Sequence, residues 1–141
     1  LMLFLAMSLI LSSPTYAAKE LIEGPLHAEV LSVYDGDTIK VRIHVWLGLY
    51  KRISIRVRGI DTPEIRGKCQ EEKEKAILVR ELVKQLVENR VVLTHIIRGK
   101  FAGRAVANVW TKRNESIATI LIGTKHARSF DGKSKREGWC P

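Results

Sequence analysis

The sequence predicts a mainly β domain of the α+β class, with five strands in a small closed barrel, one long amphipathic helix and one short helix. Several short segments alternate apolar and polar residues, which is the period of a half-buried strand. One central segment, residues 69–89, changes to a helical period. The 141 residues, 45% of them hydrophobic, suffice for one core and are few for two domains. A small β-sandwich is the alternative architecture.

Three strands joined by two turns are expected first, at residues 27–33, 37–45 and 52–59. The sequence Asp35-Gly36 between the first two strands is a strong hairpin signal. The second turn is expected to be centred near Gly48 or Leu49. In the third strand, alternation places Ile53 and the apolar residues two and four positions later on one face.

The helix expected at residues 69–89 carries an apolar stripe, formed by Ala76, Val79, Leu82, Val83 and Leu86. Two further strands are expected at residues 90–97 and 105–110, and the short helix at residues 116–122. Three meandering strands, a helix and two more strands are typical of a five-stranded Greek-key barrel of the OB type. The long helix is then expected to cover one end of the barrel.

The first 18 residues contain no charged side chain, whereas the rest of the chain is rich in charge. Their apolar run is shorter than the about 20 residues that span a bilayer, and it leads to small residues at Ala17 and Ala18. Residues 1–18 are therefore expected to be a secretory signal peptide, with a core helix or membrane anchor as the alternative. Residues 19–141 are then the folded domain, periplasmic or secreted and without stable membrane association after cleavage.

The composition is basic, with 24 Lys and Arg against 15 Asp and Glu and a formal net charge of +9. Such a chain is expected to bind a polyanion, either nucleic acid or an acidic membrane surface. No basic amphipathic helix supports the membrane surface. The four histidines lack the spacing of a zinc site. The protein is expected to be a monomer.

Cys69 and Cys140 are the two cysteines of the chain, and they have one possible intramolecular pairing. An exported protein resides in an oxidising compartment, so a disulfide between them is expected to hold the C-terminal end. Neither cysteine has a histidine nearby in sequence that would activate a thiol.

A pair of carboxylates is expected at one end of the second hairpin. If the turn is centred near Gly48 or Leu49, Asp37 lies opposite Ile60 or Asp61, and the two aspartates point to the same face. Like charges at the edge of a core are costly unless a cation lies between them, and a hard cation such as Ca²⁺ prefers carboxylate oxygens. The alternative is that the first aspartate serves only its turn and the second only caps the segment after it.

Four motifs follow one another along the chain. They are Asp35-Gly36-Asp37-Thr38, Arg-Val-Arg-Gly-Ile-Asp-Thr-Pro-Glu at residues 56–64, Gly103-Arg104, and Ala-Arg-Ser-Phe-Asp-Gly-Lys-Ser-Lys-Arg-Glu-Gly-Trp-Cys at residues 127–140. The first motif alone is a weak signal, but its combination with the second and third is highly specific. Over about residues 27–140 the chain resembles the thermonuclease family, also called the staphylococcal nuclease-like family.

The resemblance implies a Ca²⁺ site formed by Asp37, Asp61 and the backbone carbonyl of Thr62. It also implies that Glu64 is the general base or water-orienting group, and that Arg56 and Arg104 bind the scissile phosphate. These roles suit phosphodiester hydrolysis, because a cation and two guanidiniums stabilise developing negative charge while a carboxylate positions water. Strict alternation places Arg56 on the face opposite Asp61, so their convergence requires barrel curl or a bulge.

The implied activity is hydrolysis of DNA and RNA, single-stranded or frayed, with little sequence preference and products ending in 3′-phosphates. The alternative, from a different class, is a catalytically inactive OB module that binds nucleic acid. The presence of all five charged site residues favours the enzyme.

The chain departs from the family pattern just before Gly103-Arg104, where it reads Lys100-Phe101-Ala102 instead of ending in tyrosine. The aromatic ring that helps to hold the nucleotide in the family is therefore either absent or displaced to Phe101. Further phosphate contacts are expected from four basic residues, Lys100, Lys133, Lys135 and Arg136. Trp139 is expected to pack beside the cysteine bridge rather than to stack on a base.

Overall fold

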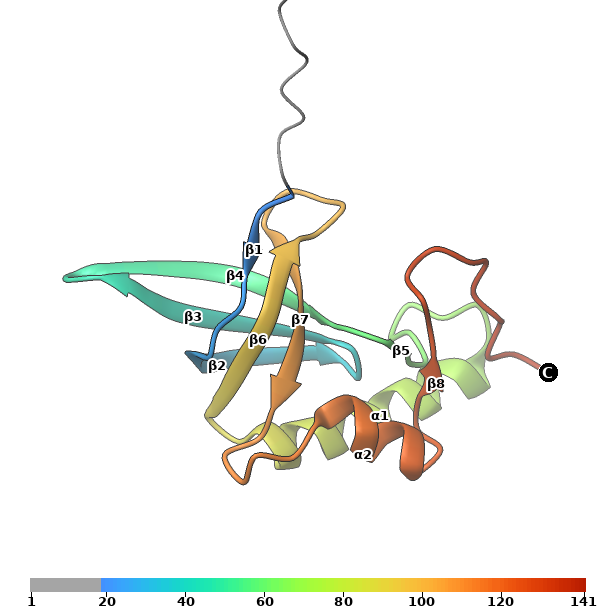
Figure 1. Ribbon diagram of the computed structural model, residues 1–141. Coiled ribbons are helices and arrows are strands. Elements are labelled where there is room, and N and C mark those ends of the chain that lie inside the picture. Colours follow the sequence, from blue (N-terminus) through green and yellow to red (C-terminus); the bar gives the residue numbers. More distant parts are fainter. Residues whose placement is uncertain (1–18) are drawn as a thin grey trace, which may run out of the picture.

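Five strands close into a barrel in the computed structural model, which describes residues 19–141 (Figure 1). The barrel strands are β2 (Leu26–Asp35), β3 (Thr38–Trp46), β4 (Leu49–Val57), β6 (Arg90–Arg98) and β7 (Arg104–Trp110). They pair in the order β6-β2-β3-β4-β7, and β7 pairs again with β6. Only β4 and β7 are parallel among these pairs. The mainly β, OB-type Greek-key barrel is thereby confirmed, and the sandwich is excluded. The expected signal peptide, residues 1–18, lies outside the described residues.

Three short strands were not predicted from the sequence. β1 (Leu21–Ile22) extends the sheet beside β6, while β5 (Ile60–Asp61) pairs with β8 (Arg128–Ser129) in a separate two-stranded sheet. A strand of two residues is too short to show an alternating pattern. The β5–β8 pair brings the C-terminal segment to Asp61.

Helix α1 (Gln70–Val87) lies under the open end of the barrel, and α2 (Ile117–Gly123) lies beside it (Figure 1). The buried positions of α1 follow a helical period, at Glu72, Ala76, Val79, Val83 and Val87. The three valines belong to the core cluster with the inward side chains of the barrel strands, which include Ile39, Val41, Ile55 and Leu93. The charged member of the row, Glu72, belongs to the site described below. None of the helices within residues 19–141 has both the length and the apolar character needed to cross a bilayer.

The register of the second hairpin differs from the expected one. Its turn lies at Leu47-Gly48, with Gly48 at a φ of 73°, and a bulge interrupts the pairing near the end of β3. Ile39 consequently faces Ile55, and the carbonyl of Asp37 accepts a hydrogen bond from the N–H of Val57 at 2.8 Å. The expectation that Asp37 lies directly opposite Ile60 or Asp61 was wrong, because turn position and bulge together shift the pairing by several residues.

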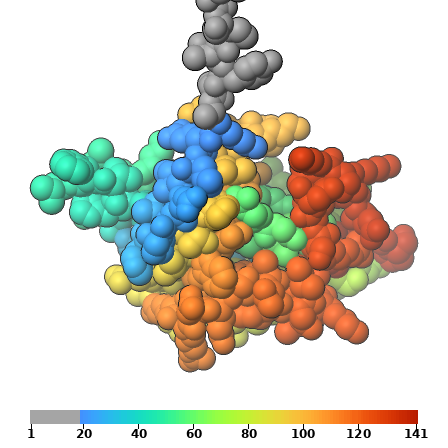
Figure 2. Space-filling model, viewed as in Figure 1, coloured from blue at the N-terminus to red at the C-terminus, as the bar shows by residue number. Residues whose placement is uncertain are grey.

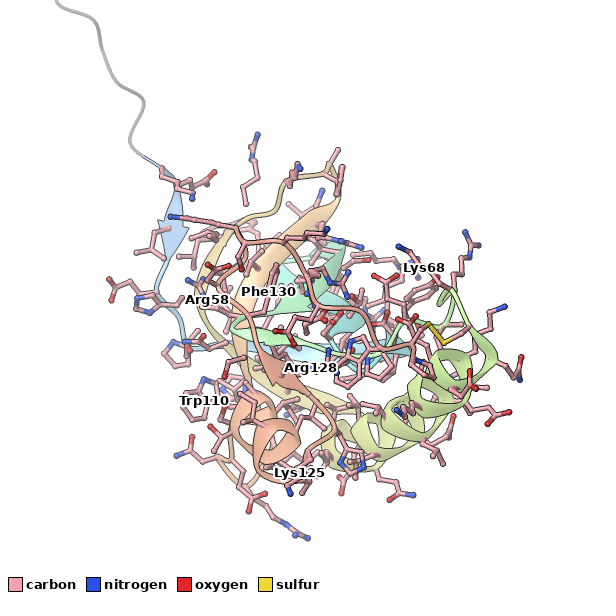
Figure 3. The ribbon with its side chains drawn as sticks, turned by 90° about the vertical axis from the view of Figure 1, so that its right-hand side faces the viewer. Arg58, Lys68, Trp110, Lys125, Arg128 and Phe130 are labelled. Carbon is pink, nitrogen blue, oxygen red and sulfur yellow. A yellow bond between two sulfur atoms is a disulfide. The ribbon has the colours of Figure 1, made fainter. Side chains whose placement is uncertain are left out.

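The disulfide between Cys69 and Cys140 is present, and among residues 19–141 no cysteine is free. It joins the start of α1 to the C-terminal segment across a sequence separation of 71 residues, with the two Cα atoms 6.0 Å apart. Figure 3 shows the bond beside the labelled Lys68, at the end of α1 nearest the C-terminal segment. The bond therefore ties residues 130–140, which lack long secondary structure, to the body of the domain.

Replacing Cys140 by serine should lower the free energy of unfolding by about 2–4 kcal/mol, because a crosslink across a long loop restricts the unfolded chain. Urea unfolding followed by fluorescence measures the change, with reductant-treated wild type as the matching comparison. Intact-mass measurement after alkylation of the native protein tests the bond itself. Alkylation of both thiols without reductant would contradict it.

Candidate active site

Three aspartates are buried together at the end of the barrel that carries the β2–β3 turn and β5. Asp35, Asp37 and Asp61 are each less than a tenth exposed. Thr62, which is fully buried, donates both its backbone N–H and its hydroxyl to Oδ2 of Asp37, each at 3.1 Å. Thr62 follows Asp61 directly, so these two bonds hold the β5 segment against the β2–β3 turn.

Gly36, between the first two aspartates, is required by space rather than by backbone conformation. A Cβ at this position would lie 2.5 Å from Cγ1 of Val79 and 2.8 Å from Cγ2 of Thr62. The absence of a side chain therefore allows α1 and the Thr62 segment to approach the turn together. This close approach explains why the two turn aspartates are separated by glycine.

Arg56 reaches the aspartates although it lies on the outer face of β4. Its Nη1 atom is 2.5 Å from Oδ1 of Asp37, and its Nη2 atom donates to the carbonyl of Ile60 at 3.1 Å and lies 3.9 Å from Oδ1 of Asp61. The chain reverses at Gly59, whose φ is 83°, so alternation does not continue from β4 into β5. A tight glycine turn brings Asp61 to the guanidinium.

Arg104 stands beside Arg56 because β4 and β7 are parallel neighbours. Ser54 pairs with Arg104 and Arg56 pairs with Val106, so the two arginines are two positions apart on the same outer face. Barrel closure therefore sets these two guanidiniums side by side, although 47 residues separate them in sequence.

Glu64 is half-exposed, and the C-terminal segment contributes its partner. Arg136 forms ion pairs with Glu64 and with the buried Asp61. Burial works against the charged guanidinium, but the hydrogen bonds to Glu64 and Asp61 outweigh it and raise the pKa of Arg136 above its ordinary value. Arg136, expected to be a phosphate contact, is thus engaged by carboxylates in this structure.

Glu72 anchors the loop that follows Glu64. Its buried carboxylate accepts the N–H of Glu64 at 3.3 Å and the N–H of Lys68 at 3.0 Å. Gly67 packs against it so closely that a Cβ there would lie 2.5 Å from Cγ of Glu72. Backbone N–H groups therefore satisfy the buried carboxylate of Glu72. These hydrogen bonds hold the backbone at Glu64 against α1.

Two hollows meet at Arg56 and Arg104. The smaller, about 220 Å³, contains the carboxylates of Asp35, Asp37 and Glu64 beside arginines, and Tyr34, Thr38, Arg66 and Arg136 also line it; it is called the acidic hollow after its carboxylates. The larger, about 580 Å³, is basic and aromatic and includes Lys19, Arg58, Lys100, Phe101, Phe130 and Lys133. Both arginines line both hollows. Figure 3 labels Arg58 and Phe130 on this side of the molecule.

The expected phosphate contacts are divided between different places. Lys100, Phe101 and Lys133 line the larger hollow, where the ring of Phe101 lies 5.9 Å from Nζ of Lys100 and 6.0 Å from Cζ of Arg104. Lys135 instead borders a small separate hollow that contains Asp61. The structure thus brings three of the expected contacts beside the arginine pair and leaves Lys135 away from it.

The loop that presents Lys133 is organised by Asp131. The carboxylate of Asp131 accepts the backbone N–H groups of Ser134 and Lys133 and the hydroxyl of Ser134, each at 2.8 Å. These hydrogen bonds lower the pKa of Asp131 to about 2. The turn is therefore held by a carboxylate that stays ionised at ordinary pH.

Several site residues were missed from the sequence. Phe130 and Arg58 fall within the motifs at residues 127–140 and 56–64 but were given no role there, whereas Glu72 falls on the buried helical period and was detectable there. Trp139 was expected only to pack, yet its Nε1 donates to Oδ2 of Asp61 at 3.0 Å. The centroid of its ring also lies 3.9 Å from Cζ of Arg128. Trp139 therefore packs against Arg128 and also holds the side chain of Asp61.

Burial and mutual repulsion both act on the clustered aspartates. Burial, followed by the neighbouring charge of Asp37, raises the pKa of Asp35 from 3.8 to about 7. Oδ1 of Asp61 is buried and accepts no hydrogen bond, although cations lie near it. Carboxylate oxygens of this kind are the donors that a hard divalent cation prefers. The donor chemistry therefore fits such a cation.

A second acidic group does not offer a metal site. Within residues 19–141, the one set of three His, Cys, Asp or Glu residues whose ligand atoms all lie within 4.8 Å of one another is Cys69, Glu72 and Cys140. Both sulfur atoms are bonded to each other, and Glu72 is engaged by backbone N–H groups. This cluster is structural.

Comparison with known families gave one match. A family model described as staphylococcal nuclease homologue matches residues 54–138, which is more than half of the chain. The matched range contains Arg56, Asp61, Thr62, Glu64 and Arg104. A search of curated proteins found no match.

Asp35→Asn should stabilise the protein more at pH 8 than at pH 5 in the presence of EDTA. Because the pKa of Asp35 is raised when folded, the folded protein binds more protons than the unfolded chain between about pH 4 and pH 7, and stability falls as pH rises through that window. The asparagine side chain does not titrate, so the variant does not lose stability in this way. Melting temperatures of the variant and of wild type at pH 5 and pH 8 measure the difference.

Asp131→Asn is the control, because the pKa of Asp131 is lowered and its contribution is constant between pH 5 and pH 8. A pH-independent difference between Asp35→Asn and wild type would contradict the assignment.

Glu72→Ala should lower the free energy of unfolding by about 1–3 kcal/mol, since it leaves the N–H groups of Glu64 and Lys68 without their acceptor. Glu71→Ala, an exposed position one residue earlier, should change it much less. Urea unfolding of both variants checks the difference. Equal changes in the unfolding free energy of the two variants would show that Glu72 contributes only to the stability of α1 and not to that of the loop at residues 64–68.

Proposed function

This chain belongs to the family of staphylococcal nuclease homologues, and on that premise we propose that it is a calcium-dependent nuclease that hydrolyses DNA and RNA. The observation that carries the proposal is the placement of Arg56 and Arg104, which line both the acidic hollow and the basic, aromatic hollow. A phosphodiester bound between the hollows has guanidiniums at its phosphate, carboxylates on one side and aromatic rings on the other.

Arg56 and Arg104 bind the non-bridging oxygens of the scissile phosphate. Their planar guanidiniums offer paired N–H donors, and the negative charge that develops during hydrolysis strengthens these bonds. Arg56 is held in place beforehand by Asp37 and the carbonyl of Ile60, so little reorganisation is needed. Arg104 is fixed by its strand pairing with β4.

Glu64 orients the attacking water and accepts its proton. Its carboxylate is half-exposed and lines the acidic hollow beside the arginines. The ion pair with Arg136 must open for this role, and the phosphate groups of a substrate offer Arg136 a replacement partner. The side chain of Arg136 then has two positions. It contacts carboxylates in the free protein and a phosphate in the substrate complex.

Asp37, Asp61 and the carbonyl of Thr62 hold the calcium ion, with Asp35 behind them. When bound, Ca²⁺ supplies positive charge next to the phosphate and holds water molecules. The burial of Asp35 and its closeness to the charge of Asp37, which together raise its pKa, support a divalent cation at this place.

Single-stranded or frayed nucleic acid is the proposed substrate, with little sequence preference. Phe101 and Phe130 line the larger hollow with Lys100 and Lys133, and a base stacks on an aromatic ring only when it is unpaired. Products ending in 3′-phosphates follow from the family resemblance. We further propose a monomer that acts in the periplasm or outside the cell, which the disulfide supports because such bonds persist in oxidising compartments.

A catalytically inactive nucleic-acid-binding module is the second candidate. The ion pair between Arg136 and Glu64 favours it, since a carboxylate held by a guanidinium does not accept a proton from water. The enzyme is preferred because the chain retains both arginines and all the carboxylates that the chemistry uses.

Glu64→Gln should slow cleavage by about two to four orders of magnitude, the usual effect of removing a positioned acid-base group, while nucleic-acid affinity is retained. Asp61→Asn should instead weaken calcium binding, so that part of its activity returns at high calcium. Cleavage of a single-stranded oligonucleotide over a calcium series measures both.

Lys75→Gln, on the exposed face of α1, serves as the control and should match wild type. The enzyme hypothesis would be contradicted if wild-type protein cleaved neither DNA nor RNA with calcium, or if Glu64→Gln cleaved at the wild-type rate. Either result would favour the binding module.

A further inference from the structure

The β3–β4 hairpin extends well beyond the barrel. Figure 1 shows the two strands continuing as an arm after the other strands have ended, and Figure 2 shows this arm standing clear of the rest of the surface. β7 pairs with β4 only at residues 54–57, so the segment from Leu49 to Ile53 has no strand partner except β3.

The outer face of the arm begins at the site. Thr38 pairs with Arg56, Lys40 with Ser54, Arg42 with Arg52, and His44 with Tyr50. These side chains face away from the core, because the alternate residues Ile39, Val41 and Ile55 are buried inside the barrel. Ser54 also pairs with Arg104, so the row continues directly from the two arginines of the site.

Lys40 and Arg52 are exposed and take part in no ion pair among the described residues. The acidic residue on the neighbouring strand, Glu29, is occupied, because its carboxylate binds Arg42 at 2.6 Å. The face therefore presents two free cationic groups beyond the site.

Aromatic rings lie at the far end of the row. The rings of His44 and Tyr50 stack with their centroids 4.7 Å apart, and Cζ of Arg42 lies 4.9 Å from the centroid of Tyr50. Tyr50 is 54% exposed. The ion pair with Glu29 holds Arg42 over the ring of Tyr50, and His44 is exposed as well, so the two stacked rings form an aromatic platform that solvent reaches.

We propose that the outer face of the β3–β4 hairpin, from Lys40 and Arg52 to the platform of His44 and Tyr50, is an extended binding track for single-stranded nucleic acid. The inference rests on the proposed function. Lys40 and Arg52 bind phosphates, and Tyr50 and His44 stack a base several nucleotides from the scissile bond. From Arg56 to Tyr50 the strand spans about 20 Å.

An acidic membrane surface is the other partner that an apolar, basic hairpin end fits. Trp46 and Leu47, at the tip, are 72% and 84% exposed. Nucleic acid is favoured because the row is continuous with the arginine pair and runs along the strands, whereas membrane insertion would use only the tip. The two partners are separated by the experiment below.

The test is binding in EDTA, which removes cleavage from the measurement. Fluorescence anisotropy compares two labelled single strands, one of about three nucleotides and one of about twelve, a length within the range that an OB fold covers. Arg52→Gln and Tyr50→Leu should each weaken binding of the longer strand about five-fold or more, with a much smaller effect on the shorter one. Arg52→Gln should also reduce the log-log salt slope by about one.

Arg113→Gln is the matched control, since Arg113 is exposed in the loop after β7, at the end of that strand opposite to Arg104. It should bind both strands as wild type does. If the hairpin variants bind the longer strand normally, or lose both lengths equally, the track is refuted. If they bind oligonucleotides normally while wild-type protein binds phosphatidylserine vesicles, the arm is a membrane contact and the track is likewise refuted.

Failure of the proposed enzyme gives a different result. Wild-type protein without calcium-stimulated cleavage, but with length-dependent binding that the hairpin variants lose, would refute the nuclease and support the track.

Discussion

Buried negative charge at one end of the barrel is the constraint around which the rest of the structure is arranged. Asp35, Asp37 and Asp61 are almost inaccessible to water, and carboxylates in such surroundings need partners of opposite charge. Arg56 enters from the outer face of β4, and Arg136 is brought from the C-terminal segment. Burial, followed by the neighbouring charge of Asp37, raises the pKa of Asp35 to about 7. Carboxylates with a strongly shifted pKa cluster at functional sites.

The C-terminal segment supplies both sides of the site although it contains little regular structure. Phe130 faces the larger hollow, Arg136 faces the carboxylates, and Trp139 donates to Asp61. A two-residue strand pair is too short to hold such a segment, so the disulfide to the start of α1 and the stacking of Arg128 on Trp139 fix it. Precise site geometry thus depends on a segment that the barrel core does not hold.

Alternating side chains were sufficient to predict the five barrel strands, and the helical stripe predicted α1, because both depend on local burial patterns. The register of the second hairpin was not predictable, since a bulge near Val45 has no sequence signature. Arg56 could be placed at the aspartates only through the family resemblance, because its convergence depends on the turn at Gly59. Contacts made by Arg136 and Phe130 depend on tertiary folding of the end of the chain and left no periodic pattern.

The parallel pairing of β4 and β7 has a consequence for how the protein folds. It joins Ser54 to Arg104 across the whole of α1 and β6, so the entropy of loop closure opposes it, and topologies with many long-range contacts fold slowly. Local hairpins such as β2–β3 can form without it. Because Arg56 and Arg104 become neighbours only through this pairing, partly folded chains with an open barrel lack the arginine pair. The phosphate recognition proposed for this arginine pair therefore requires the closed barrel.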